Sequence, residues 1–130
     1  MTWKMAHRSE RGFTLVELMV VVVVIGVLCT IAIPMYSNVQ ARARLAQAQA
    51  DSRTLASAIS TYGARMGRIP SALTQLTTVS TNAQGQSAGP FVASVPVAPG
   101  GWASYSYTPN VSAGTFTITT SGDGTSVSVP

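Results

Sequence analysis

The first long feature of the chain is an apolar run over residues 13–33 that contains a single charged residue, Glu17. A helix of this length spans about 31 Å, close to the thickness of a bilayer's hydrocarbon core. The β-branched residues 20–25 are also typical of a buried strand, but such long strands are rare, and about 18 or more apolar residues favour a spanning helix. We therefore predict a transmembrane helix over residues 13–34.

Charges that flank the apolar run predict its orientation. Residues 1–12 carry a net charge of +2 (three basic residues against Glu10), and no basic residue follows the run before Arg42. The positive-inside rule then places the N-terminus in the cytoplasm and residues 35–130 outside. A cleaved secretory signal peptide, cut near Thr30-Ile31-Ala32, is the alternative. The run is longer than the apolar region of a signal peptide, and its pattern continues as helix, so we favour a retained helix.

Beyond Pro34 the pattern becomes amphipathic. Small or apolar residues recur in alternating steps of four and three, which places them on one side of a helix. This stripe comprises Ala41, Leu45, Ala48, Ser52, Leu55, Ile59 and Tyr62. Polar residues such as Arg44 and Asp51 are predicted to lie on the other side. We expect the stripe over residues 52–62 to pack against the chain's own C-terminal part, and residues 13–40 to pack against other copies of the helix.

The amphipathic segment, residues 35–68, continues the apolar helix. Gly67 and Pro70 indicate the end of the helix, so we predict that it runs from about Thr14 to about Met66. A proline inside a helix removes one backbone hydrogen bond and loosens or kinks the helix at that point, which is expected at Pro34.

Residues 69–130 form a predicted head of short strands. Apolar and polar side chains alternate between turns that contain glycine, proline or asparagine. The strands are predicted over residues 91–95, 102–108, 115–120 and 125–129. Residues 71–76 are predicted as a short helix capped by Ser71, and residues 77–90 as a loop. The fold class is therefore α+β, with a long N-terminal helix packed on a small antiparallel meander of three or four strands.

The charge distribution excludes several functions. The net charge is +4, which often indicates a nucleic-acid partner. Residues 71–130 contain no basic residue and one acidic residue, Asp123, so a basic patch cannot form there. The single Cys29 excludes an internal disulfide, and the single His7 excludes a two-histidine metal or catalytic centre. We predict that the chain is not an enzyme and has neither catalytic residues nor a resident cofactor.

Glu17 is the costly residue of the apolar run, because a carboxylate in hydrocarbon usually needs a partner. No Lys, Arg or His lies between Phe13 and Ala41. Two interpretations remain open from position alone. Glu17 either reaches the cytoplasmic interface or is protonated there, or it pairs with a positive group from another chain or from a newly created amine.

Residues 11–17, Arg-Gly-Phe-Thr-Leu-Val-Glu, favour the second interpretation. Preceded by a short basic peptide and followed by a spanning helix, they resemble the processing site of type IV pilins and type II secretion pseudopilins. Gly26 and Pro34 also stand where members of that family often carry Gly and Pro. The resemblance implies that a membrane prepilin peptidase cuts between Gly12 and Phe13 and methylates the new amine.

The resemblance also implies how the subunit assembles. The Phe13 amine of one subunit would pair with Glu17 of a neighbour, and the helix would melt near Pro34 in the filament. Partners would be copies of the chain, the peptidase, an assembly platform with its ATPase, and inner-membrane lipids. The subunit would be a single-pass inner-membrane protein with its head in the periplasm, and the filament would lie in the periplasm or outside the cell.

The head resembles that of the major pseudopilin of type II secretion more loosely, over residues 62–70 and 89–124. A protein-export subunit is therefore favoured over a type IV pilus subunit for motility, adhesion or DNA uptake, or a minor pilin that acts as a binding module. Those pseudopilins commonly hold calcium with acidic residues after the first strand. Residues 96–101 lack a carboxylate here, so Asp123 is a weak metal candidate and is better explained as a turn residue.

Overall fold

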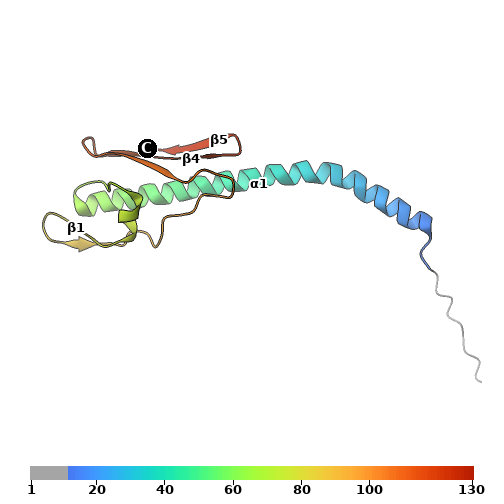
Figure 1. Ribbon diagram of the computed structural model, residues 1–130, viewed down its shortest axis with the longest axis horizontal. Coiled ribbons are helices and arrows are strands. Elements are labelled where there is room, and N and C mark those ends of the chain that lie inside the picture. Colours follow the sequence, from blue (N-terminus) through green and yellow to red (C-terminus); the bar gives the residue numbers. More distant parts are fainter. Residues whose placement is uncertain (1–11) are drawn as a thin grey trace, which may run out of the picture. The chain divides into compact units, whose positions relative to one another are not determined.

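The computed structural model describes residues 12–130. It contains one long helix, α1 (Leu15–Met66), a 3₁₀ helix, η1 (Leu73–Thr77), and strands β1 to β5 (Figure 1). The backbone contacts divide the chain into two compact units, which meet between Asn38 and Val39. The predicted leader lies outside the described residues except for Gly12.

Helix α1 confirms the predicted helix, and its assignment runs through Pro34 without a break. Every side chain from residue 13 to residue 40 is exposed, including that of Phe13, which is 83% exposed. Within residues 12–130, α1 is the one helix long and apolar enough to cross a membrane. Nothing in this part of the chain buries that apolar surface.

The second half of α1 buries the predicted stripe. Leu55 and Ile59 are fully buried and Tyr62 nearly so, and they share a core with Leu76 and Ile118. The helix ends as expected at Gly67, whose φ of 71° is left-handed and whose N–H donates to the Gly63 carbonyl at 2.9 Å. The stripe therefore packs on the chain's own head.

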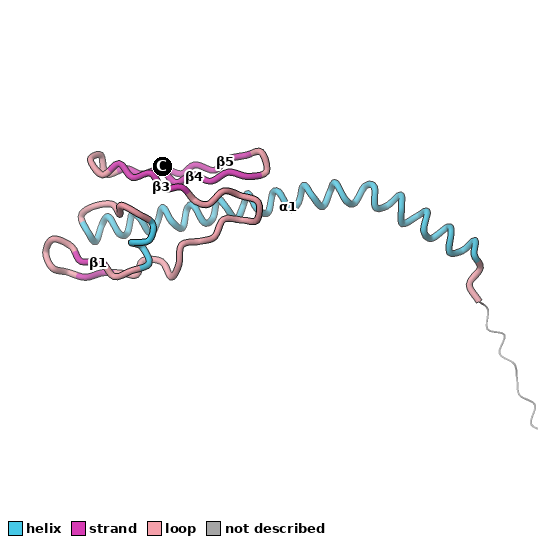
Figure 2. Tube along the Cα trace, viewed as in Figure 1, coloured by secondary structure: helices cyan, strands magenta, loops and turns pink. Residues whose placement is uncertain are grey.

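Three strands form an antiparallel sheet along one side of this half of α1 (Figures 1 and 2). They are β3 (Ser106–Asn110), β4 (Thr115–Gly122) and β5 (Thr125–Val129), in the order β3-β4-β5. Burial alternates along β4, with Phe116 partly buried and Ile118 fully buried, as the pattern predicts. The α+β fold class is confirmed.

The predicted bounds of the first of these strands are wrong. Trp102 precedes the strand in a turn, where its N–H donates to the Pro99 carbonyl at 2.9 Å. Pro109, which we expected in the following turn, lies inside β3 opposite Phe116. The sheet accepts this proline because β3 is an edge strand, which has a ladder partner on one side only.

The predicted strand over residues 91–95 does not form. The N–H groups of Phe91 and Val92 both donate to the Leu76 carbonyl, at 2.8 and 3.1 Å, rather than to a ladder. Phe91, Val92 and Val95 pack against the core. Their apolar character therefore reflects burial in an irregular segment.

A small hairpin forms instead inside the predicted loop. Strand β1 (Ser80–Thr81) pairs with β2 (Ser87–Ala88). The Asn82 side chain organises the turn, since its Oδ1 accepts from the N–H groups of Gln84 and Gln86 at 3.0 and 2.8 Å. The Asn82 side chain thus takes the place of a backbone acceptor and shapes this turn.

The predicted cap at Ser71 is also wrong. The residue that precedes η1 is Ala72, and it makes no side-chain cap hydrogen bond. The Ser71 N–H instead donates to Oε1 of Gln75 at 2.9 Å. The short helix is therefore held by a glutamine from within its own turn.

Candidate functional site

The start of α1 forms a reciprocal capping box between Thr14 and Glu17. The Thr14 hydroxyl accepts from the Glu17 N–H at 3.2 Å. The Glu17 carboxylate, through Oε2, accepts from the Thr14 N–H at 2.9 Å and from the Thr14 hydroxyl at 2.7 Å. This arrangement satisfies backbone donors that the first turn of a helix otherwise leaves unpaired.

The capping box corrects our view that Glu17 has no partner within its own segment. That view considered only cations, whereas the partners are the N–H and hydroxyl of a neutral residue, Thr14. The signal was present in the sequence, because Thr-x-x-Glu before an apolar run is the signature of a capping box. Oε1 of Glu17 makes no hydrogen bond within residues 12–130, so one oxygen stays available for an external donor.

A second group of contacts fastens the head to α1, through Asp123 in the β4–β5 turn. Nε and Nη2 of Arg44 donate to its two carboxylate oxygens at 2.7 and 2.9 Å. Nε1 of Trp102 donates to the same carboxylate at 2.8 Å. The indole also covers Gly122 so closely that a Cβ there would clash with the ring atoms of Trp102. We call Arg44, Trp102 and Asp123 the anchor triad.

The charge environment follows from this geometry. The hydrogen bond from Arg44 is the main cause that lowers the pKa of Asp123, and the hydrogen bond from Trp102 lowers it further. The Arg44–Asp123 hydrogen bond also raises the pKa of Arg44. Asp123 is also the turn residue that we predicted, with a φ of 50°. Arg44, which we predicted on the polar side of the helix, binds Asp123 of its own chain.

Asp123 does not fit a calcium site. Both of its oxygens already accept hydrogen bonds from cationic or neutral donors. Within residues 12–130 no cluster of three or more His, Cys, Asp or Glu side chains exists. Calcium takes six to eight oxygen ligands, and a site here would have to draw all but those of Asp123 from backbone carbonyls, hydroxyls or water.

Two tyrosines, one just before β3 and one within it, add polar contacts to α1 and to the segment that follows it. The Tyr105 hydroxyl donates to Asp51 at 2.9 Å, and the Tyr107 hydroxyl donates to the Pro70 carbonyl at 2.7 Å. Burial, followed by the hydrogen bond to Asp51, raises the pKa of Tyr105. Asp51, like Arg44, was predicted on the side away from the stripe. The long side chains of Tyr105 and Arg44 therefore join the polar side of α1 to the head.

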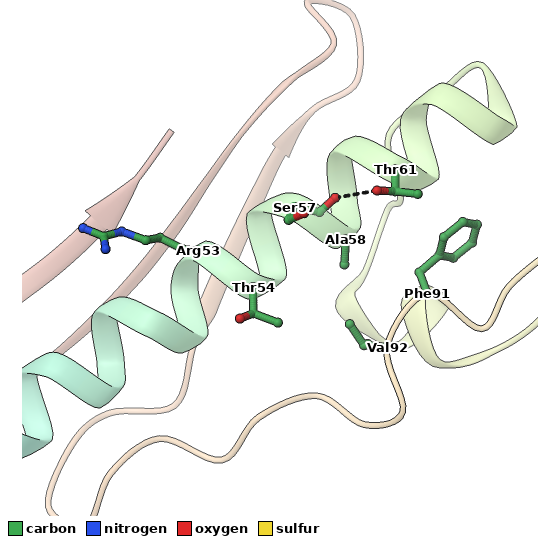
Figure 3. A pocket seen from close by; sticks show the side chains of 7 residues that line it. All are labelled: Arg53, Thr54, Ser57, Ala58, Thr61, Phe91 and Val92. Carbon is green, nitrogen blue, oxygen red and sulfur yellow. Dashed lines mark hydrogen bonds between the residues drawn. The ribbon is translucent and has the colours of Figure 1, made fainter.

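A groove of about 420 Å³ lies between α1 and the segment that carries Phe91 and Val92 (Figure 3). Its floor is made by small helix residues such as Ala58, and Arg53 stands at one end. The Thr61 hydroxyl on its wall donates back to the Ser57 carbonyl at 2.9 Å. No group of catalytic side chains converges there.

The comparisons with known proteins agree with these features. The family model of the prokaryotic N-terminal methylation motif matches residues 7–33. The model of type II secretion system protein G matches residues 35–128. No solved structure matches the chain.

Among curated proteins, the chain is similar to type IV fimbrial subunits. It is 44% identical over 52 residues to the type IV major fimbrial protein FimA of Dichelobacter nodosus, covering 40% of this chain and 33% of that protein. It is 37% identical over 62 residues to a fimbrial protein of Neisseria meningitidis serogroup A, covering 48% and 36%. For a fimbrial protein of Pseudomonas aeruginosa the identity is 43% over 51 residues, covering 39% and 33%. The chain thus spans about a third of the length of these relatives.

The fold, a long apolar helix packed on a small antiparallel sheet, and the methylation motif define a subunit of the type IV pilin and pseudopilin class. By the match over residues 35–128, the chain belongs to the type II secretion system protein G family. Members of this class are membrane-anchored structural subunits that are processed and then assemble with copies of themselves, and they are not enzymes.

Proposed function

We propose that this chain is a structural subunit of the type II secretion pseudopilus, a periplasmic fibre that serves protein export. The observation that carries the proposal is the match of the protein G model to the head as well as to the helix, over residues 35–128. The exposed apolar surface of residues 13–39 supports it, since that surface needs a membrane before assembly and other helices afterwards.

In this proposal the peptidase cleaves between Gly12 and Phe13, and the new amine is methylated. Oε1 of Glu17 in a neighbouring copy then accepts a hydrogen bond from that amine, while Oε2 stays bound to Thr14 of Glu17's own chain. The chain lies in the inner membrane before assembly, with the head in the periplasm. Extraction by a platform protein and an ATPase moves Glu17 from lipid into a helix bundle, where Pro34 gives the helix local freedom.

A type IV pilus subunit is the second candidate, favoured by the similarity to fimbrial proteins of three organisms. A minor pilin that binds nucleic acid is less well supported, because residues 71–130 carry no basic residue.

Deletion of the gene in its native host separates the two candidates. We expect the deletion to abolish export of secreted enzymes into the medium and to leave surface motility and DNA uptake intact. Re-expression of the wild-type chain should restore export. Normal export together with lost motility would contradict the pseudopilus and support the pilus.

A further inference from the structure

The β4–β5 turn carries the only acidic residue of residues 71–130, Asp123. Its backbone is left-handed, and a glycine stands on each side of it. In this conformation the carboxylate meets Arg44 of α1, which lies 79 residues earlier in the chain. The single charge of the turn is thus matched by a single charge of the helix.

Arg44 binds Asp123 through two parallel hydrogen bonds. Nε of Arg44 lies 2.7 Å from Oδ2, and Nη2 lies 2.9 Å from Oδ1. A bidentate pair of this kind fixes orientation as well as charge, and it is stronger than a hydrogen bond between neutral groups. Oδ2 also accepts from Nε1 of Trp102 at 2.8 Å. A metal ion that chelated both oxygens would need the position that the guanidinium fills.

The segment just before β3 is fastened in the same place without a metal. The Ala103 N–H donates to the Ser121 carbonyl at 2.8 Å, and the Thr120 hydroxyl donates to the Ala103 carbonyl at 2.6 Å. The indole of Trp102 adds its bond to the turn. Residues 96–101, where the pseudopilins that this head resembles carry acidic calcium ligands, lead directly into this fastened segment. Nitrogen and hydroxyl donors therefore hold the segment that carboxylates and a cation would otherwise hold.

The fixed charge of Arg44 also opposes a second cation. A divalent ion on Asp123 would lie within a few ångströms of the guanidinium, and like charges at such distances repel each other. The side chains of Arg44 and Asp123 are only 31% and 28% exposed, so water screens this repulsion incompletely. An ion could bind the carboxylate only if Arg44 first left it.

We propose that Arg44 is a built-in cation that takes the place of calcium in this head. Its guanidinium supplies the positive charge, and Trp102 completes the link between α1, the segment before β3 and the β4–β5 turn. Because this charge is a covalent part of the helix, the link forms on folding and takes no ion from solution. The head is therefore equally stable with and without calcium.

Terbium(III) luminescence tests whether Asp123 is closed to a calcium-like ion. Terbium(III) binds at oxygen-ligated calcium sites, and a nearby tryptophan excites its emission. The chain that begins at Phe13 has one tryptophan, Trp102, whose N–H is bonded to Asp123. We expect no terbium emission that added calcium abolishes. Emission that calcium abolishes would overturn the proposal.

Thermal unfolding of the same chain in detergent measures what Arg44 contributes. We expect Tm in EGTA and in about 5 mM calcium chloride to agree within about 1 °C, although this concentration fills even sites of millimolar affinity. Arg44→Met keeps an unbranched stem without the charge and should lower Tm by at least about 3 °C in both media. Arg44→Lys keeps a charge without the planar fork and should lower Tm less.

Arg53→Met is the matched control on the same helix. Arg53 is exposed, and its side chain makes no hydrogen bond or ion pair within residues 12–130, so Tm should not change. A wild-type Tm that rises with calcium, or equal losses in Arg44→Met and Arg53→Met, would overturn the proposal. If circular dichroism shows that Arg44→Met is unfolded, Arg44→Lys and Arg53→Lys are compared instead. The inference depends on the folded head alone, so its failure leaves the fibre-subunit proposal untouched.

Discussion

The two halves of helix α1 bury very different amounts of surface. Residues 15–38 expose every side chain, although most are apolar, whereas residues 39–66 bury a stripe that includes Leu55 and Ile59. One continuous helix thus carries a segment stabilised by its own head and a segment whose partner must come from outside. Helix propensity alone leaves such a long helix marginal, so both partners matter.

The acidic residues of the two regions also differ in where their bonding partners come from. In the head, Asp123 is bound by a cation, Arg44, and Asp51 accepts a hydrogen bond from Tyr105. Glu17 has neutral donors from Thr14, and the sequence has no Lys, Arg or His from Phe13 to Ala41. Both acidic residues of residues 39–130 therefore have hydrogen-bond partners from distant parts of the same chain, whereas Glu17 is bound only by its neighbour Thr14 within residues 12–130.

The largest expected effect follows from removing the carboxylate of Glu17. Glu17→Val should insert into the membrane and be processed, yet fibre yield should fall at least about tenfold, because a neighbour's amine would stay unpaired in an apolar environment. Immunoblots of membrane and sheared-fibre fractions measure insertion, processing and yield together.

Glu17→Gln is the matched control, because glutamine also serves in a capping box but carries no charge. We expect it to fail in assembly as Val does. Normal fibre yield from Glu17→Gln would show that capping, rather than charge pairing, is the role of Glu17.

The next prediction compares an isoleucine-to-alanine substitution in the two halves of α1. Ile59→Ala should lower the free energy of unfolding of the head by about 2–5 kcal/mol, since Ile59 is fully buried in the core. Ile25→Ala, at a position 53% exposed, should change it by less than about 0.5 kcal/mol. Denaturant unfolding of a detergent-solubilised chain that begins at Phe13, and so carries Trp102 but not Trp3, measures both by tryptophan fluorescence. Equal losses would mean that the apolar half is part of the same folding unit.

Gly122→Ala tests the anchor triad. The added Cβ would meet the Trp102 ring, and the indole would have to leave Asp123. We expect a loss of about 1–3 kcal/mol in unfolding free energy, the usual cost of overpacking. Gly100→Ala, where a Cβ meets no atom within 4 Å, should leave stability unchanged. A wild-type Trp102 spectrum in Gly122→Ala would contradict the close packing.

The smallest effect is on pH dependence. Because the folded-state pKa of Asp123 is lowered, its stabilising contribution is present above about pH 4 and is lost as pH falls through the folded value. Asp123→Asn should lower Tm slightly at neutral pH and flatten the acid limb of the Tm–pH profile. An unchanged acid limb would show that the Arg44 pair contributes nothing measurable, as many exposed pairs do.

Periodicity predicted the parts of the fold that depend on repeated burial. The stripe from Ala48 to Tyr62 and the alternation of Phe116 and Ile118 both follow from it. It failed at residues 91–95, where an apolar run fills the core without pairing, because burial and ladder formation leave the same short pattern.

Long-range polar contacts could not be predicted in the same way. Arg44 and Asp123 lie 79 residues apart, and nothing local marks them as partners. The capping box was different, since Thr14 and Glu17 stand three residues apart in a recognisable signature. Local chemistry was therefore within reach of the sequence, and contacts set by the tertiary fold were not.

The central claim is that the apolar half of α1 is completed by other copies after processing at Gly12. Mass spectrometry of the mature chain from its native membrane tests it most directly. The account predicts a chain that begins at Phe13 with a methylated amine. A chain that retains Met1, or one that begins near Ile33, would contradict it.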